Sequence, residues 1–199
     1  GCELRIMPDR NQAVSFACAA LATGGNVLLE KIPHDPLYSF LNFIQRMGAE
    51  FKVNSEGIYV SCPKDRRLKQ SHVEIEVHPG FMTDWQQPFM VLFTQANGIS
   101  ILHETIFENR LNYTHYLNKM GANIHLHSAC LGEAPCRFKN KNHLHSAIIY
   151  GPTHLTPAEF ILPTDIRAAM GLVIAGLVAE GTSKFTNIQE LQRKYDHFV

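Results

Sequence analysis

The stretch TDWQQPFMVLFTQANGISILHETI, residues 83–106, carries the pattern that organises the whole chain. Asp84 stands near its start, a long apolar segment follows, and Gly98 ends that segment. An aspartate before an apolar run and a glycine after it are start and stop signals of a helix. The β-branched run that follows Gly98 predicts a strand, so the stretch predicts a helix that leads directly into a strand.

The same layout occurs in PDRNQAVSFACAALATGGNVLLEKI, residues 8–32, and in TDIRAAMGLVIAGLVAEGTSKFTNI, residues 164–188. Each of the three stretches opens with an aspartate that follows Pro or Thr, continues through about four helical turns, and stops at a glycine. The leading aspartates are Asp9, Asp84 and Asp165, and the closing glycines are Gly25, Gly98 and Gly181.

A second amphipathic segment follows in each case, within residues 37–53, 112–126 and 191–199. In the first two it ends in Met-Gly-Ala, and the two pairs of glycines are equally spaced. Gly25 and Gly48 are 23 residues apart, as are Gly98 and Gly121. Matching spacing at matching positions predicts a structural repeat of βαβ-like units.

The repeat predicts one α/β domain over residues 1–199. The third unit reaches Val199 inside its second predicted helix, so we expect it to be truncated, without its last strand. The segment from Ser128 to Ile161 is expected to be an extended hairpin or surface loop that interrupts the repeat, with the strand-like stretch HSAIIYG at residues 145–151. The expected units are repeat 1 at about 1–70, repeat 2 at about 71–128, an insertion at about 129–161 and partial repeat 3 at about 162–199.

Composition excludes several classes of protein. Lys and Arg together number 18, as do Asp and Glu, so overall charge gives no reason to expect a nucleic acid or membrane partner. No apolar run approaches the length of a membrane span, and the N-terminus lacks the layout of a signal peptide. Five scattered cysteines without a C-x-x-C pair indicate free thiols. These features favour a cytoplasmic protein.

Two cysteines, Cys130 and Cys136, raise the question of a metal because four histidines lie near them in the sequence. Their C-x5-C spacing is loose for a zinc knuckle, and the neighbouring His-x-His pairs are equally well explained as polar alternation along a strand. We therefore expect no metal and no cofactor. The histidines concerned are His125, His127, His143 and His145.

Chemistry is expected instead at the helix starts, where aspartates and arginines recur. The chain has no nucleophile elbow, Walker loop or dinucleotide fingerprint. Equivalent junctions of a repeat lie on one edge of the domain. Arginines gathered there can bind an anionic ligand, and an aspartate can accept a proton from a hydroxyl group. Helix capping alone accounts for Asp9 with Arg10, and equally well for Asp165 with Arg167. Asp84, beside Trp85, is the preferred functional acid.

Four motifs carry a resemblance to a known family: HPGFMTDWQQPF (78–89), ETIFENR (104–110), LNKMGANI (117–124) and TDIRAAMGLVIAGLVAEGT (164–182). With their order and spacing, the chain resembles the enolpyruvyl transferases, in particular the UDP-N-acetylglucosamine 1-carboxyvinyltransferases. The resemblance implies an inside-out α/β barrel domain built from βαβαββ repeats. This chain corresponds to the C-terminal domain, and an N-terminal domain is the expected partner across the active-site cleft.

The family transfers enolpyruvyl from phosphoenolpyruvate to the 3′-hydroxyl of UDP-N-acetylglucosamine in peptidoglycan synthesis, without a cofactor. The resemblance implies that Asp84 contacts and deprotonates that hydroxyl. Ile106 and Phe107 are expected along the UDP-sugar, Ile106 through its backbone. The roles implied for the remaining residues are phosphoenolpyruvate binding by Arg110 and Arg193, proton transfer or positioning at the reacting carbon by Asp165, and support of Asp165 by Arg167.

Two departures from the family pattern leave alternatives open. Around Arg193 the chain reads ELQRKYD, where the family has a histidine, an acid and a glycine at the positions of Glu190, Gln192 and Lys194. The family's reactive cysteine loop belongs to the other domain, so this chain alone is expected to be inactive. The alternatives are a 5-enolpyruvylshikimate-3-phosphate synthase-like enzyme and a non-catalytic ligand-binding or regulatory module.

Overall fold

The computed structural model describes residues 1–4, 6–65 and 67–195. Asp196, the last residue of the ELQRKYD motif, lies outside them. In chain order the elements are α1 (Arg10–Ala22), β1 (Asn26–Glu30), η1 (Asp35–Leu37), α2 (Tyr38–Arg46), β2 (Glu50–Val53), β3 (Gly57–Ser61), β4 (His72–Glu74), η2 (Thr83–Trp85), α3 (Gln86–Gln95), β5 (Gly98–His103), α4 (Thr114–Lys119), β6 (Ile124–His127), β7 (Ser146–Gly151), β8 (Glu159–Ile161), α5 (Ile166–Val178), β9 (Lys184–Thr186) and α6 (Gln189–Lys194).

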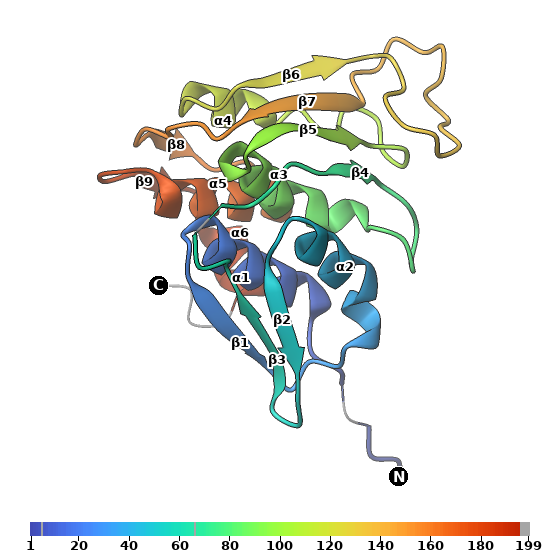
Figure 1. Ribbon diagram of the computed structural model, residues 1–199, viewed down its shortest axis with the longest axis vertical. Helices are drawn as coiled ribbons and strands as arrows, with labels where there is room; N and C mark the ends of the chain where they lie inside the picture. The colour runs from blue at the N-terminus through green and yellow to red at the C-terminus, as the bar shows by residue number, and fades with distance from the viewer. Residues whose placement is uncertain (5, 66, 196–199) are drawn as a thin grey trace.

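Three helices, α1, α3 and α5, pack against one another in the middle of the molecule, and the sheets lie outside them (Figure 1). One sheet has the order β1-β3-β2, a second β4-β5-β7-β6, and β8 pairs with β9. The helix α3 is buried from Gln86 to Thr94 because it is apolar on nearly every side. The arrangement is a mixed α/β fold with helices at its centre.

The predicted repeat is visible in how α2 and α4 end. Gly48 and Gly121 both adopt φ of +97°, a left-handed conformation that favours glycine. The amide of the alanine after each glycine donates to the carbonyl five residues back, over 3.0 Å in both cases. Met-Gly-Ala is therefore one helix-ending motif used twice, as the sequence predicted.

The βαβ prediction is confirmed for two helices. β4 pairs in parallel with β5 across α3, and β8 pairs in parallel with β9 across α5. Residues 146–151 form a strand, β7, as their sequence predicted. This strand pairs with both β5 and β6 inside its sheet, although it was expected within an interruption of the repeat. β6 and β7 repeat the hairpin of β2 and β3, with a connection lengthened to residues 128–145.

An aromatic cluster joins the central helices to the rest of the core. Phe89 of α3 lies edge-on to its neighbours, with ring centroids 4.9 to 6.0 Å apart. Such contacts favour edge-to-face geometry and bury large apolar areas. The rings around it belong to Phe40, Phe81 and Phe93, and Trp85 packs against Phe40 and Phe81.

No helix among the described residues has the length and apolar character needed to cross a membrane.

Candidate active site

The starts of the three central helices meet at the carboxylate of Asp84. Arg167, in the first turn of α5, places its Nε 3.6 Å from Asp84 Oδ2. Asn11, in the first turn of α1, places its Nδ2 3.5 Å from the same oxygen. The indole of Trp85 donates to Asn11 Oδ1 over 2.9 Å and fixes that amide. The expectation that these junctions share one edge is therefore confirmed for α1, α3 and α5.

The three leading aspartates do not do the same work. Asp9 accepts hydrogen bonds from the amides of Asn11 and Gln12, and Asp165 accepts from the amides of Arg167 and Ala168. Both are side-chain N-caps.

The side chain of Asp84 makes no cap hydrogen bond to α3, so this helix-leading aspartate differs from the other two. The turn η2 shifts the helix start to Gln86, and Pro88 in the first turn has no amide hydrogen to satisfy. The Asp84 carboxylate remains available to other partners.

Arg110 is the second cation at Asp84 and is held from three sides. Its Nη2 donates to Asp84 Oδ1 over 2.8 Å. With the Gln87 amide turned so that its oxygen faces Arg110, Nε donates to that oxygen over 3.1 Å. The guanidinium also lies 4.9 Å from the centroid of the Phe107 ring. A guanidinium fixed in this way is preorganised for a planar anion.

Arg167 is the more deeply buried of the two arginines, with 8% of its side chain exposed. Its Nη1 is buried and has no hydrogen-bond partner among the described residues. The expected partner was Asp165, but Arg167 meets Asp165 through its backbone amide and turns its guanidinium to Asp84. A buried, unsatisfied cationic donor is costly in a folded protein, and a ligand that accepted its hydrogen bond would remove that cost.

Glu104 organises the loop that carries the expected sugar-binding residues. Its carboxylate is fully buried and accepts from the amides of Ile106 and Phe107 over 2.7 and 3.2 Å. Thr83 Oγ1 and Gln86 Nε2 each donate to its other oxygen over 2.7 Å. The loop after β5 is thus tied to the start of α3. Sequence analysis missed Glu104, although an acid directly after a buried strand was a visible signal.

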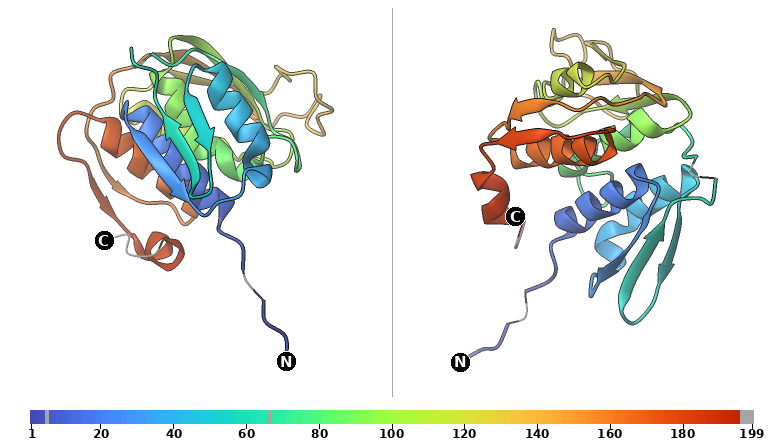
Figure 2. Two further views of the ribbon diagram at one scale, coloured as in Figure 1. Left: turned by 60° about the horizontal axis from the view of Figure 1, so that its bottom comes forward. Right: turned by 90° about the vertical axis from the view of Figure 1, so that its left-hand side faces the viewer.

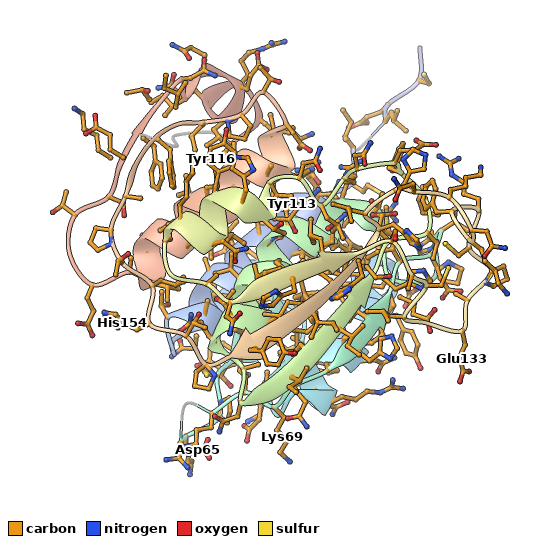
Figure 3. All side chains as sticks on the ribbon, turned by 90° about the horizontal axis from the view of Figure 1, so that it is seen from above. Asp65, Lys69, Tyr113, Tyr116, Glu133 and His154 are labelled. Carbon is orange, nitrogen blue, oxygen red and sulfur yellow. The ribbon has the colours of Figure 1, made fainter. Side chains whose placement is uncertain are left out.

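Tyr113 closes the site from the side of α4. Its hydroxyl donates to Gln86 Oε1 over 3.2 Å. Burial raises the pKa of Tyr113 well above its usual range, and the negative charges of Asp165 and Glu104 raise it further. The side chain therefore remains a neutral donor. Figure 3 shows Tyr113 over the middle of the molecule, ahead of Tyr116 on α4.

Arg193 is the expected site residue that lies apart. Its Nη1 pairs with Glu190 one turn earlier on α6, over 3.2 Å, and 76% of its side chain is exposed. None of the contacts found within the described parts of the chain joins it to Asp84, Arg110 or Arg167. Its neighbour Lys194 reaches Asp9 instead, with Nζ 3.0 Å from the carboxylate.

Taken together, the site offers a half-buried carboxylate between two fixed guanidinium groups, next to a braced loop. A family model described as EPSP synthase (3-phosphoshikimate 1-carboxyvinyltransferase) matches residues 1–199. The chain belongs to this enolpyruvyl transferase family. The resemblance inferred from the four motifs is confirmed.

Curated relatives of this chain have a more specific name than the family description. The UDP-N-acetylglucosamine 1-carboxyvinyltransferase of Protochlamydia amoebophila (strain UWE25) is 43% identical over 199 residues, which cover 99% of this chain and 42% of that protein. The protein of the same name from Chlamydia muridarum (strain MoPn / Nigg) is 44% identical over 199 residues, covering 99% and 44%. The chain spans less than half the length of these relatives.

Solved structures of enolpyruvyl transferases share the fold. The crystal structure of the enolpyruvyl transferase NikO from Streptomyces tendae matches with a TM-score of 0.75 at 19% identity, over 96% of this chain and 41% of that chain. EPSP synthase from Acinetobacter baumannii matches with a TM-score of 0.65 at 19% identity, over 96% and 45%. At this identity the likeness shows the mixed α/β fold alone.

Proposed function

We propose that this chain forms one half of the active site of a UDP-N-acetylglucosamine 1-carboxyvinyltransferase. The enzyme transfers enolpyruvyl from phosphoenolpyruvate to the 3′-hydroxyl of UDP-N-acetylglucosamine, in the cytoplasm, as a step of peptidoglycan synthesis. The names of the relatives at 43% and 44% identity support this acceptor. The single observation that carries the proposal is the Asp84 carboxylate, which is not used as a cap and lies between Arg110 and Arg167.

In the proposed reaction Asp84 accepts the proton of the sugar hydroxyl. A general base must lie within hydrogen-bond reach of the proton it removes, and 31% of the Asp84 side chain is open to a substrate. Arg110 moves from its pairing with Asp84 to the anionic groups of phosphoenolpyruvate. That exchange brings positive charge to phosphoenolpyruvate and frees the Asp84 carboxylate to accept the proton of the sugar hydroxyl.

The remaining assignments follow the geometry of the braced loop and of α5. Ile106 and Phe107 contact the UDP-sugar from the loop that Glu104 fixes. Asp165 positions or transfers protons at the reacting carbon. Arg167 supports Asp165 through its backbone amide and orients Asp84 through its guanidinium. Arg193 binds phosphoenolpyruvate only after α6 moves, since its guanidinium now pairs with Glu190.

The other half of the cleft belongs to an N-terminal domain with the reactive cysteine and further cationic groups. We propose that the two halves are inside-out α/β barrels of the same design, and that repeats at about 1–70, 71–128 and 162–199 compose this one. Binding groups that converge only when the halves close give weak affinity separately, so the chain alone is inactive.

Comparison of two acceptors tests the proposal. The full-length protein is incubated with phosphoenolpyruvate and either UDP-N-acetylglucosamine or 3-phosphoshikimate, and phosphate release is measured. We expect release with the nucleotide sugar alone. Release with 3-phosphoshikimate alone would show that the protein is a 5-enolpyruvylshikimate-3-phosphate synthase-like enzyme instead. Binding of UDP-N-acetylglucosamine without release would establish a non-catalytic module instead.

A further inference from the structure

Four potential metal ligands converge at the far end of the β4-β5-β7-β6 sheet, apart from Asp84. His103 ends β5, His145 precedes β7, and Cys130 and Cys136 lie in the long connection between β6 and β7. One ligand atom from each lies within 4.8 Å of all the others. Both imidazoles are fully buried, and both thiols are half-buried. Sequence analysis weighed three of these residues and expected no metal; it did not consider His103.

Strand pairing brings the two histidines together. In the antiparallel ladder of β5 and β7, His103 is opposite Ser146, so His145 lies beside the end of β5. The amide of Glu104 donates to the His145 carbonyl over 2.7 Å, and the two imidazole centroids are 5.4 Å apart. The sheet itself therefore fixes half of the ligand set.

Each histidine has one ring nitrogen already engaged. Nδ1 of His103 lies 3.4 Å from the Glu74 carboxylate, and Nδ1 of His145 lies 2.7 Å from the His143 carbonyl. Metal-binding histidines in proteins characteristically donate their second nitrogen to a carboxylate or a backbone carbonyl. Nε2 of His145 lies 3.4 Å from Cys130 Sγ. Nε2 of His103 is buried and has no partner among the described residues.

We propose that His103, His145, Cys130 and Cys136 bind a structural Zn²⁺ ion. Zn–N bonds of about 2.0 Å and Zn–S bonds of about 2.3 Å place tetrahedral ligand atoms about 3.3 to 3.8 Å apart. The observed sulfur-to-nitrogen distance of 3.4 Å fits that range, and the 4.8 Å limit of the cluster requires only small side-chain rotations. Two thiolates and two neutral imidazoles complete the coordination, which makes the site structural and not catalytic.

The connection between the two cysteines is shaped around the same site. The amides of Glu133 and Ala134 donate to the two Glu74 carboxylate oxygens over 3.0 and 2.7 Å. A Cβ on Gly132 would overlap both that carboxylate and the His103 ring, so the close approach requires glycine here. Figure 3 shows Glu133 at the outer edge of the molecule, on the turn of this connection.

The zinc site holds a long connection that extends away from the body of the fold (Figure 2). The zinc site lies next to the loop after β5, because Glu104 follows His103 directly. Metal content is a readout independent of enolpyruvyl transfer, so the zinc proposal and the proposed function can fail separately.

Metal analysis of the full polypeptide, purified under reducing conditions without chelators, tests the inference. We expect zinc in equimolar amount to the chain, and a thiolate-to-cobalt absorption band after exchange with Co²⁺. Cys136→Ser is expected to lose the zinc, whereas Cys2→Ser, at an exposed cysteine outside the cluster, retains it.

Cys136→His separates loss of a ligand from loss of the fold, since it restores a zinc-binding nitrogen and is expected to retain the metal. A wild-type protein that holds no zinc and gives no cobalt band would overturn the inference. The same conclusion would follow from a Cys130–Cys136 disulfide in freshly purified protein, or from equal zinc in Cys136→Ser.

Discussion

Asp84 differs from Asp9 and Asp165 in what its carboxylate contacts. In the sequence all three precede an apolar helix, and only the position of Asp84 beside Trp85 set it apart. The structure separates them through residues distant in the chain, since Arg110 and Arg167 reach Asp84 while the other two bond to nearby amides. A cap is a local interaction, whereas the contacts of the Asp84 carboxylate depend on long-range packing.

Glu104 provides a prediction at the scale of a single residue. Glu104→Gln retains the size of the side chain but turns a donor toward groups that already donate. Because four donors share this buried carboxylate, we expect a loss of about 2–3 kcal/mol in unfolding free energy. The Michaelis constant for the acceptor is expected to rise, since the loop of Ile106 and Phe107 is no longer braced.

Urea unfolding and steady-state kinetics check this expectation. Glu108→Gln, in the same loop, is the matched control, because Glu108 is exposed and its pairing with Arg137 is a surface ion pair. Its unfolding midpoint is expected to remain close to wild type. Equal destabilisation by the two variants would refute the bracing role of Glu104.

Helix ends are the elements that the sequence predicted best. Asp9 and Asp165 cap their helices, and the two Met-Gly-Ala motifs end α2 and α4 with the same glycine conformation. These signals work because each depends on a few neighbouring residues. Strand β7 was missed as part of the repeat because its partners β5 and β6 are brought to it only by sheet pairing.

The central helices also provide a prediction. Phe89 is fully buried against three other aromatic rings, whereas 46% of Phe16 on α1 is exposed. Phe89→Ala is expected to cost about 3–5 kcal/mol through lost burial and the cavity it leaves. Phe16→Ala is expected to cost under about 1.5 kcal/mol. Similar losses in thermal or urea unfolding would show that α3 is not the centre of the core.

On the scale of the whole molecule, the repeat explains both what was predicted and what was not. The starts of α1, α3 and α5 lie at one edge, as the repeated pattern predicted, and residues of α1 and α5 contact Asp84 there. The resemblance implied that Arg193 lies with Arg110, whereas the structure places Arg193 apart, exposed on α6 and paired with Glu190. The sequence also offered no reason to consider His103, because nothing in an apolar strand indicates that cysteines from a distant connection lie beside it.

The central claim is that the Asp84 carboxylate, and not either capping aspartate, takes the proton of the acceptor. The most direct test is the turnover number of Asp84→Asn in the full-length protein, measured as phosphate release from phosphoenolpyruvate with UDP-N-acetylglucosamine. We predict a fall of about 10²–10⁴-fold, the usual contribution of a general base. Asp9→Asn is the control, because asparagine caps a helix as well as aspartate does, and its turnover should match wild type. Wild-type turnover in Asp84→Asn would contradict the account.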